Sequence, residues 1–169
     1  MNSKQVVGIL GIFALLVVLI YPAFAIGSIS VVVGSSNISK ADHVYVVIND
    51  VWAHRAGQAS PAGWELVWNK STTVDLVSLA NSTLPLGKGS VSAVQFDMVK
   101  IDVGNVSWVY NKTTTLLEVE STEIPTNIAF SVTPGKVSTI TLVLTGHEEA
   151  LQGTKFFVTE LNATSTLQA

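Results

Sequence analysis

The chain has 169 residues, enough for one domain, with a net charge of −3 and no cysteine. The lack of cysteine excludes disulfides, thiolate metal sites and a lipid-modified N-terminal cysteine. The acidic balance, without a basic patch, argues against a nucleic-acid partner.

The first 25 residues have the layout of a secretory signal peptide. Lys4 precedes an apolar and glycine run, 6–20, whose 15 residues fall short of the roughly 20 that a membrane-spanning helix needs. Pro22 ends this run, and Ala23 and Ala25 place small side chains at the positions that signal peptidase reads. We expect cleavage after Ala25, with membrane contact only during export. The alternatives are an uncleaved anchor and, less favoured, a pilin-type leader cut near Lys4.

Asparagine gives the sharpest compositional signal in the 144 residues that remain after cleavage. Their eight Lys and Arg stand against twelve Asp and Glu, a net charge of −4. Six of the nine asparagines in the chain begin an Asn-x-Ser/Thr triplet, where chance predicts about two. These six are Asn37, Asn69, Asn81, Asn105, Asn111 and Asn162. We therefore expect a secreted protein with N-linked glycans, of archaeal or eukaryotic type.

A strand pattern begins one residue after the expected cleavage site. Residues 28–33 alternate and place Ile29, Val31 and Val33 on one face, which we expect to fill pockets. With Ile26 added, these are the apolar positions that we assign to the strand. The segment 34–39 is a flexible hinge, so 26–40 stands apart from the rest. It is either the first strand of the domain's own sheet or a donor strand that completes the sheet of a neighbouring copy.

Strand and turn patterns fill the rest of the chain. The first half predicts alternating strands at 44–54 and 64–68, a loop at 59–63, a short strand or helical turn at 74–79, and a Pro- and Gly-rich connection at 84–89. The second half predicts a long strand at 91–103, a tight turn at Gly104-Asn105 into 106–110, a turn at Asn111-Lys112 into 114–120, a hairpin of 127–133 with 137–144, and a last strand at 155–161. About nine strands indicate a single antiparallel β-sandwich over 41–162, with a flexible tail at 163–169.

No arrangement of residues indicates catalysis, a cofactor or a metal. His43 and His54 lie 11 residues apart on one predicted strand, hence on opposite faces, and do not form a zinc site. Asp97 and Asp102 also have opposite parity and do not form a glycosidase pair. The glutamates of the second half, at 118, 120, 123, 148 and 149, form no alternating ligand loop for calcium, and His147 is the third histidine of the chain. We expect Asp75 to cap a turn, and the protein not to be an enzyme.

Two further side chains have both a functional and a structural interpretation. Trp64 and Trp68 share strand parity, so they either form an aromatic platform for sugars or pack in the core. Lys100 lies in the middle of a predicted strand, so it needs an acidic partner if its face is buried. An ordinary salt bridge is the preferred interpretation over a covalent cross-link.

Five segments together resemble the secreted family known as domain of unknown function 4382. They are 43–54 (HVYVVINDVWAH), 63–66 (GWEL), 74–76 (VDL), 96–101 (FDMVKI) and the 130–144 region. The order and spacing carry the resemblance, which spans roughly 28–161. It implies a transthyretin- or immunoglobulin-like β-sandwich, commonly surface-attached, with no established activity. Many bacterial relatives begin with a lipidated cysteine, which this chain lacks.

A looser, architectural likeness connects the chain to archaeal surface filament subunits of the thread and bundling-pilus kind. The shared features are the signal peptide, the small all-β domain, the many glycosylation triplets and the lack of cysteine. In such filaments the N-terminal strand of one subunit completes the sheet of the next. We therefore predict a glycosylated structural protein of an archaeal-type cell surface that associates head to tail through 26–33. The alternative is a monomeric binding module for sugars or surface polymers.

Overall fold

A computed structural model describes residues 25–36, 38, 41–119, 121–151 and 154–168, with side chains given for all of these except 147–151, 154–159 and 168. No described helix is long and apolar enough to cross a membrane. The strands are β1 Ile26–Ser35, β2 His43–Arg55, β3 Trp64–Trp68, β4 Thr72–Asp75, β5 Thr83–Ser92, β6 Gln95–Tyr110, β7 Thr113–Val119, β8 Glu123–Ser131, β9 Val137–Leu151 and β10 Thr154–Gln168. The expected signal peptide lies outside the described residues, apart from Ala25.

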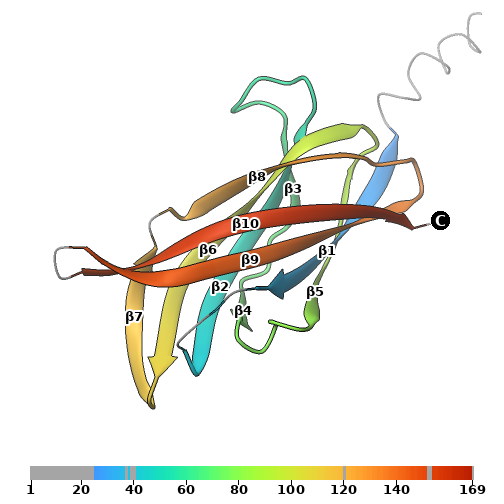
Figure 1. Cartoon of the computed structure of the whole chain (residues 1–169). Coiled ribbons are helices and arrows are strands. Elements are labelled where there is room, and N and C mark those ends of the chain that lie inside the picture. The colour runs from blue at the N-terminus through green and yellow to red at the C-terminus, as the bar shows by residue number, and fades with distance from the viewer. Residues whose placement is uncertain (1–24, 37, 39–40, 120, 152–153, 169) are drawn as a thin grey trace, which may run out of the picture.

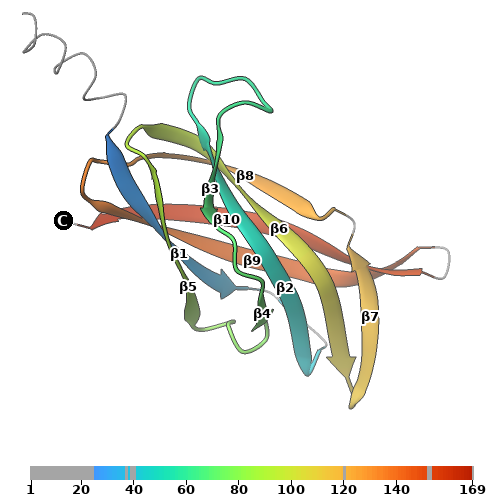
Figure 2. The ribbon, with the colours of Figure 1, turned by 180° about the vertical axis from the view of Figure 1, so that it is seen from behind.

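The strands form two sheets that pack face to face (Figures 1 and 2). Sheet A has the order β5-β1-β9-β10. Sheet B has β2 and β6 at its centre, with β3 and β4 along one edge and β8 and β7 along the other. All pairs are antiparallel except β1 with β9 and β7 with β10. The predicted all-β sandwich is confirmed, with ten strands instead of about nine.

The two sheets join along one side and approach closely along the other. On the joined side, β7 pairs with β10 through residues 118–119 and 156–157, so one continuous path runs from β3 to β5. At the ends of this path, a Cβ built on Gly89 of β5 would lie 1.8 Å from the carbonyl oxygen of Val67 in β3. The backbones reach this separation only because Gly89 has no side chain.

The core is made by the alternating inward residues of both sheets. Its fully buried side chains include Ile29, Val31 and Val33 from β1, and Leu142 and Leu144 from β9. Sheet B supplies Val44, Val46, Ile48, Val99, Ile101 and Val103, and the stacked rings of Phe96 and Phe130. Burial of each such side chain stabilises the fold by about 1.5–3 kcal/mol.

Two of the predicted connections lie within strands. The segment 84–89 belongs to β5, where Pro85 sits beside a bulge opposite Val31 and Val32. Proline is tolerated there because a bulge does not need its missing N–H. The predicted turn at Gly104-Asn105 is also wrong, because β6 runs through it from Gln95 to Tyr110. These two residues oppose the single residue Val47 and form a bulge instead of a reversal.

The predicted hairpin of 127–133 with 137–144 is wrong in its partners. β8 pairs with β6 in sheet B, whereas β9 pairs with β1 and β10 in sheet A. The segment Pro134-Gly135-Lys136 therefore crosses between the sheets, with Gly135 at a φ of 69°. Alternation in sequence identifies a strand and its inward face but not the strand that it pairs with. The turn predicted at Asn111-Lys112 is correct, and both residues have positive φ.

The two ends of the domain compare differently with the sequence predictions. β1 is the first strand of sheet A, which is one of the two alternatives that the sequence left open. β10 pairs with β9 as far as Gln168, where the sequence predicted a flexible tail from 163. Alternation in the tail is weak because threonine and serine occupy several of its positions. Its placement depends on the long partner strand β9.

Candidate functional site

The first strand and the slot that it fills form the candidate site. β1 lies between β5 and β9, antiparallel to β5 and parallel to β9 (Figure 1). Its pairing with β5 runs from Ile26–Ser92 to Gly34–Thr83. Both of its edges are therefore hydrogen-bonded, and its removal would expose the edges of two strands at once.

The inward face of β1 consists of every second residue. Ile29, Val31 and Val33 have no exposed surface, as the alternating pattern predicted. Ile26 was assigned to the same apolar set, but 63% of its surface is exposed. Its parity places it with the outward Ser28 and Ser30, so it does not fill a pocket. Gly27 takes the inward position at this end.

Gly27 is a residue whose role sequence reasoning missed. A Cβ at this position would lie 2.3 Å from Val132 Cγ1 and 2.7 Å from the carbonyl oxygen of Thr133. The start of β1 thus passes directly beneath the crossing from β8 to β9. The Gly135 amide donates to Ile26 O over 3.1 Å, and the Ser28 amide donates to Lys136 O over 3.1 Å. A glycine inside a strand pattern was the available signal for this close approach.

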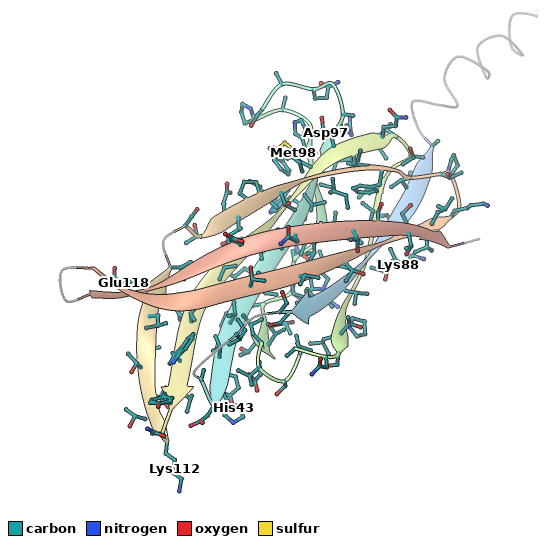
Figure 3. All side chains as sticks on the ribbon, viewed as in Figure 1. His43, Lys88, Asp97, Met98, Lys112 and Glu118 are labelled. Carbon is teal, nitrogen blue, oxygen red and sulfur yellow. The ribbon has the colours of Figure 1, made fainter. Side chains whose placement is uncertain are left out.

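We call this end of the domain the entry end; it contains the start of β1, residues 55–64, 92–95 and 131–137, and the end of β10. The opposite, exit end contains the end of β1, the start of β2, the β4–β5 connection and the β6–β7 turn. Contacts support the grouping, since the Asp42 amide donates to Val109 O and the Leu76 amide to Val44 O. Figure 3 shows His43 and Lys112 at the exit end, with Asp97 and Met98 toward the other end.

A short connection joins β1 to β2 at the exit end. It spans residues 36–42, and the Ser36 amide donates to the carbonyl oxygen of Leu144 over 3.0 Å. Ser35, just before it, is 6% exposed, and its hydroxyl has no hydrogen-bond partner among the described residues. This connection is the only covalent link between β1 and the remaining nine strands.

The glycosylation triplets avoid the entry end. All five described acceptor asparagines, Asn69, Asn81, Asn105, Asn111 and Asn162, are exposed. Asn81 and Asn111 lie in the β4–β5 connection and the β6–β7 turn of the exit end, and Asn37, which lies outside the described residues, falls in the β1–β2 connection. None of the connections at the entry end carries a triplet. Exposure of the five acceptors is compatible with glycan attachment.

Trp64 and Trp68 do not form the aromatic platform that was one of their two interpretations. Trp68 is 5% exposed in the core, whereas Trp64 is half-buried elsewhere on β3. The physical reason is a register shift, in which Val51 pairs with Trp68 and Trp52 with Leu66, so that Val67 is an extra residue. This bulge reverses the parity between the two tryptophans.

Trp64 belongs instead to a packed polar cluster. Its ring lies 4.9 Å from the ring of His54 and 4.9 Å from Nζ of Lys100. Lys100 Nζ also lies 5.8 Å from the ring of Trp52 and donates to Glu123 Oε1 over 2.8 Å. The ordinary salt bridge predicted for Lys100 is therefore confirmed. Cation and imidazole contacts on the Trp64 ring leave it poorly suited to stack on a sugar.

His54 is buried, and both of its ring nitrogens have a hydrogen-bond partner. Its Nδ1 lies 2.8 Å from Asp97 Oδ1, and its Nε2 lies 3.0 Å from the carbonyl oxygen of Ala62. His43 contacts a different carboxylate, Asp75, over 2.8 Å. The two histidines thus serve separate contacts, and no group of three or more metal-ligating residues is found where side chains are described. The side chains of His147 and of 148–149 lie outside that part of the chain.

Three carboxylates have shifted pKa values: those of Asp75 and Glu65 are lowered, and that of Asp102 is raised. Burial alone would raise the pKa of Asp75, but hydrogen bonds from Ser78, His43 and backbone amides outweigh it and lower that pKa, as expected for a turn cap. The pKa of Glu65 is lowered in the same way, because the hydrogen bonds from the Ser92 amide and from Arg55 outweigh the increase that burial alone would cause. Burial and two neighbouring carboxylates raise the pKa of Asp102.

Glu65 also ties the sheets together at the entry end. Its Oε2 accepts from the Ser92 amide of β5 over 2.8 Å, and its Oε1 accepts from Arg55 Nε of β2. Arg55 donates in turn to the Ser92 hydroxyl over 2.9 Å. These contacts fasten β3 and β5 where the sheets approach without a joining strand pair.

Comparison with known proteins identifies a family and assigns no role to the site. No curated protein and no solved structure matches the chain at a significant level. A family model described as "Domain of unknown function (DUF4382)" matches residues 27–159, from the second residue of β1 into β10. The match includes β1 as part of the domain. The chain therefore belongs to the DUF4382 family.

Proposed function

We propose that the protein is a secreted, N-glycosylated structural subunit of an extracellular, archaeal-type cell surface. In this proposal, copies associate head to tail into filaments by exchange of β1. The observation that carries the proposal is the position of β1, a two-edged core strand joined to the other nine only through residues 36–42. When this strand leaves its slot, the other strands keep their pairings with one another except β5, whose one described strand partner is β1, so β5 is paired again only when a donated strand fills the slot.

The energetics of the slot favour an occupant at all times. An empty slot exposes the edges of β5 and β9 and uncovers pockets filled by Ile29, Val31 and Val33. Strand addition supplies backbone hydrogen bonds along both edges, and the alternating side chains supply specificity. Because a neighbour's β1 is chemically identical, a second copy of the chain is the partner best matched to this slot.

Export is supported by the junction between the signal-like segment and the domain. β1 begins at Ile26, the first residue after the proposed cleavage site. Cleavage there would free the strand at its own start. A free N-terminus gives the strand the mobility that exchange requires.

The proposal is tested by separating the strand from its slot. A mature chain that begins at Gly34 should stay soluble and monomeric only with a synthetic 26–36 peptide, whereas the chain from Ile26 should assemble alone. The control peptide carries serine at Ile29, Val31 and Val33 and should not rescue. A truncated chain that is equally soluble without peptide would contradict the proposal.

The sugar-binding alternative has no specific observation in its favour. Trp68 is buried, and the half-buried ring of Trp64 contacts His54 and Lys100. We therefore do not propose it as a second function.

A further inference from the structure

This inference rests on the proposed exchange and concerns the direction in which a donated strand enters. We propose that β1 of one copy occupies the slot of the next copy in the direction opposite to that in the single chain. Ser35 would then lie at the entry end of the acceptor, where Gly27 lies in the single chain.

The reach of the connection limits how two copies can meet. Residues 36–42 are seven residues, which span at most roughly 24 Å when fully extended. The exit end of a donor, where its β2 begins at His43, must therefore lie near the place where its β1 ends in the acceptor.

Insertion in the original direction brings two exit ends together. β1 would finish beside Thr83 and Leu144 of the acceptor, as it does in the single chain. Contact between identical ends is two-fold and closes, since each copy can return its strand to the other. It also places two sets of exposed glycan acceptors, Asn81 and Asn111, against each other.

Insertion in the reverse direction gives an open chain. The donated strand then finishes at the entry end of the acceptor, so the exit end of one copy meets the entry end of the next. Such head-to-tail contacts do not close and generate filaments. The entry end suits this contact because its connections carry no glycosylation triplet, and its exposed residues include Val94.

The inward face of β1 reads almost identically in both directions. From start to end it consists of Gly27, Ile29, Val31, Val33 and Ser35, which is a symmetrical pattern about Val31. Reversal exchanges Ile29 with Val33, which differ by one methylene, and Gly27 with Ser35. It also exchanges the antiparallel and parallel neighbours, so both edges of the strand stay paired.

The residues at the two ends of β1 determine whether the strand fits better in its own slot or, reversed, in the slot of a neighbouring copy. Reversal brings Ser35 beneath Val132 and Thr133, where a Cβ has no room until that crossing shifts. It also takes the Ser35 hydroxyl out of a buried site where no described partner contacts it, and places it beside the carbonyl oxygen of Thr133. The crossing 132–136 is therefore the element that must move when a donated strand enters.

The substitution Gly27→Ala distinguishes between the two directions in which β1 can be inserted. In the single chain the new methyl group meets Val132 and Thr133, but in the reversed strand it takes the place of Ser35, which already holds a larger side chain. We expect the concentration needed for assembly to fall about tenfold, because overpacking affects only the self-closed state. The matched control is Gly34→Ala, whose Cβ would meet Thr83 Cγ2 at 3.5 Å, an ordinary contact.

Engineered disulfides report directly on the direction in which β1 is inserted. The chain has no native cysteine that would compete with the introduced pairs. In the single chain Ser28 pairs with Val137, and after reversal about Val31 it takes the place of Gly34, opposite Val143. Mature chains carrying Ser28→Cys are mixed with chains carrying either Val143→Cys or Val137→Cys, so that every cross-link between the two kinds of chain joins two copies.

The inference predicts cross-links from the Ser28→Cys chains to the Val143→Cys chains and not to the Val137→Cys chains. Cross-links to the Val137→Cys chains alone would overturn it while leaving strand exchange intact. If the chains do not assemble under any condition, the inference and the proposed function both fail. Assembly that Gly27→Ala weakens more than Gly34→Ala does would also overturn the inference.

Discussion

The substitution Ile29→Ala measures how much the first strand contributes to the domain. Ile29 has no exposed surface and lies between Gly89 of β5 and Ser138 of β9. Truncation leaves a cavity that two hydrogen-bonded neighbours cannot readily close, so we expect a loss of about 2–5 kcal/mol in the free energy of unfolding. That is a large share of the roughly 5–15 kcal/mol typical of a domain.

The measurement is urea unfolding of the mature chain at concentrations where it is monomeric, followed by tryptophan fluorescence. Ser30→Ala, one residue along on the outward face, is the control and should stay within about 0.5 kcal/mol of the parent. Equal midpoints for the two variants would refute the assignment of Ile29 to the core, and with it the slot.

Three further outcomes follow from other contacts. Gly89→Ala should destabilise the domain by about 1–3 kcal/mol or more, because its Cβ meets the Val67 carbonyl oxygen; an unchanged melting temperature would contradict the close approach of β3 and β5. Since the pKa of Glu65 is lowered from 4.5, its stabilising contribution is complete above about pH 4.5 and is lost as the pH falls through the lowered value; Glu65→Gln should flatten this part of the stability curve, and an unaltered curve would argue against the Ser92 contact. Mass spectrometry of the native protein should find a glycan on Asn105, and an unmodified residue in every molecule would count against glycosylation on this face.

Alternation was sufficient to predict most of the strands, though not β5, and much of the core. Ile29, Val31 and Val33 were assigned to one buried face because a strand places every second residue on the same side. The same rule failed for Trp64 and Trp68, because an extra residue at Val67 changes the parity between them. A bulge of this kind depends on the partner strand, and its position is not encoded in the local pattern.

Long-range partners account for the other differences. Both strands of the predicted 127–144 hairpin exist, but each pairs with strands distant in sequence. The glycines at 27 and 89 were visible in the sequence, yet the backbones that they allow to approach belong to elements far along the chain. Such contacts follow from the packing of two sheets and not from any single segment.

The most direct test of strand exchange is electron microscopy of the mature protein from its native cell surface, with mass spectrometry of its N-terminus. The account predicts filaments whose subunits begin at Ile26. Discrete monomers that begin at Ile26 would contradict it, because the strand would then fill only its own slot. Filaments whose subunits retain residues 6–20 would contradict the cleavage that frees the strand.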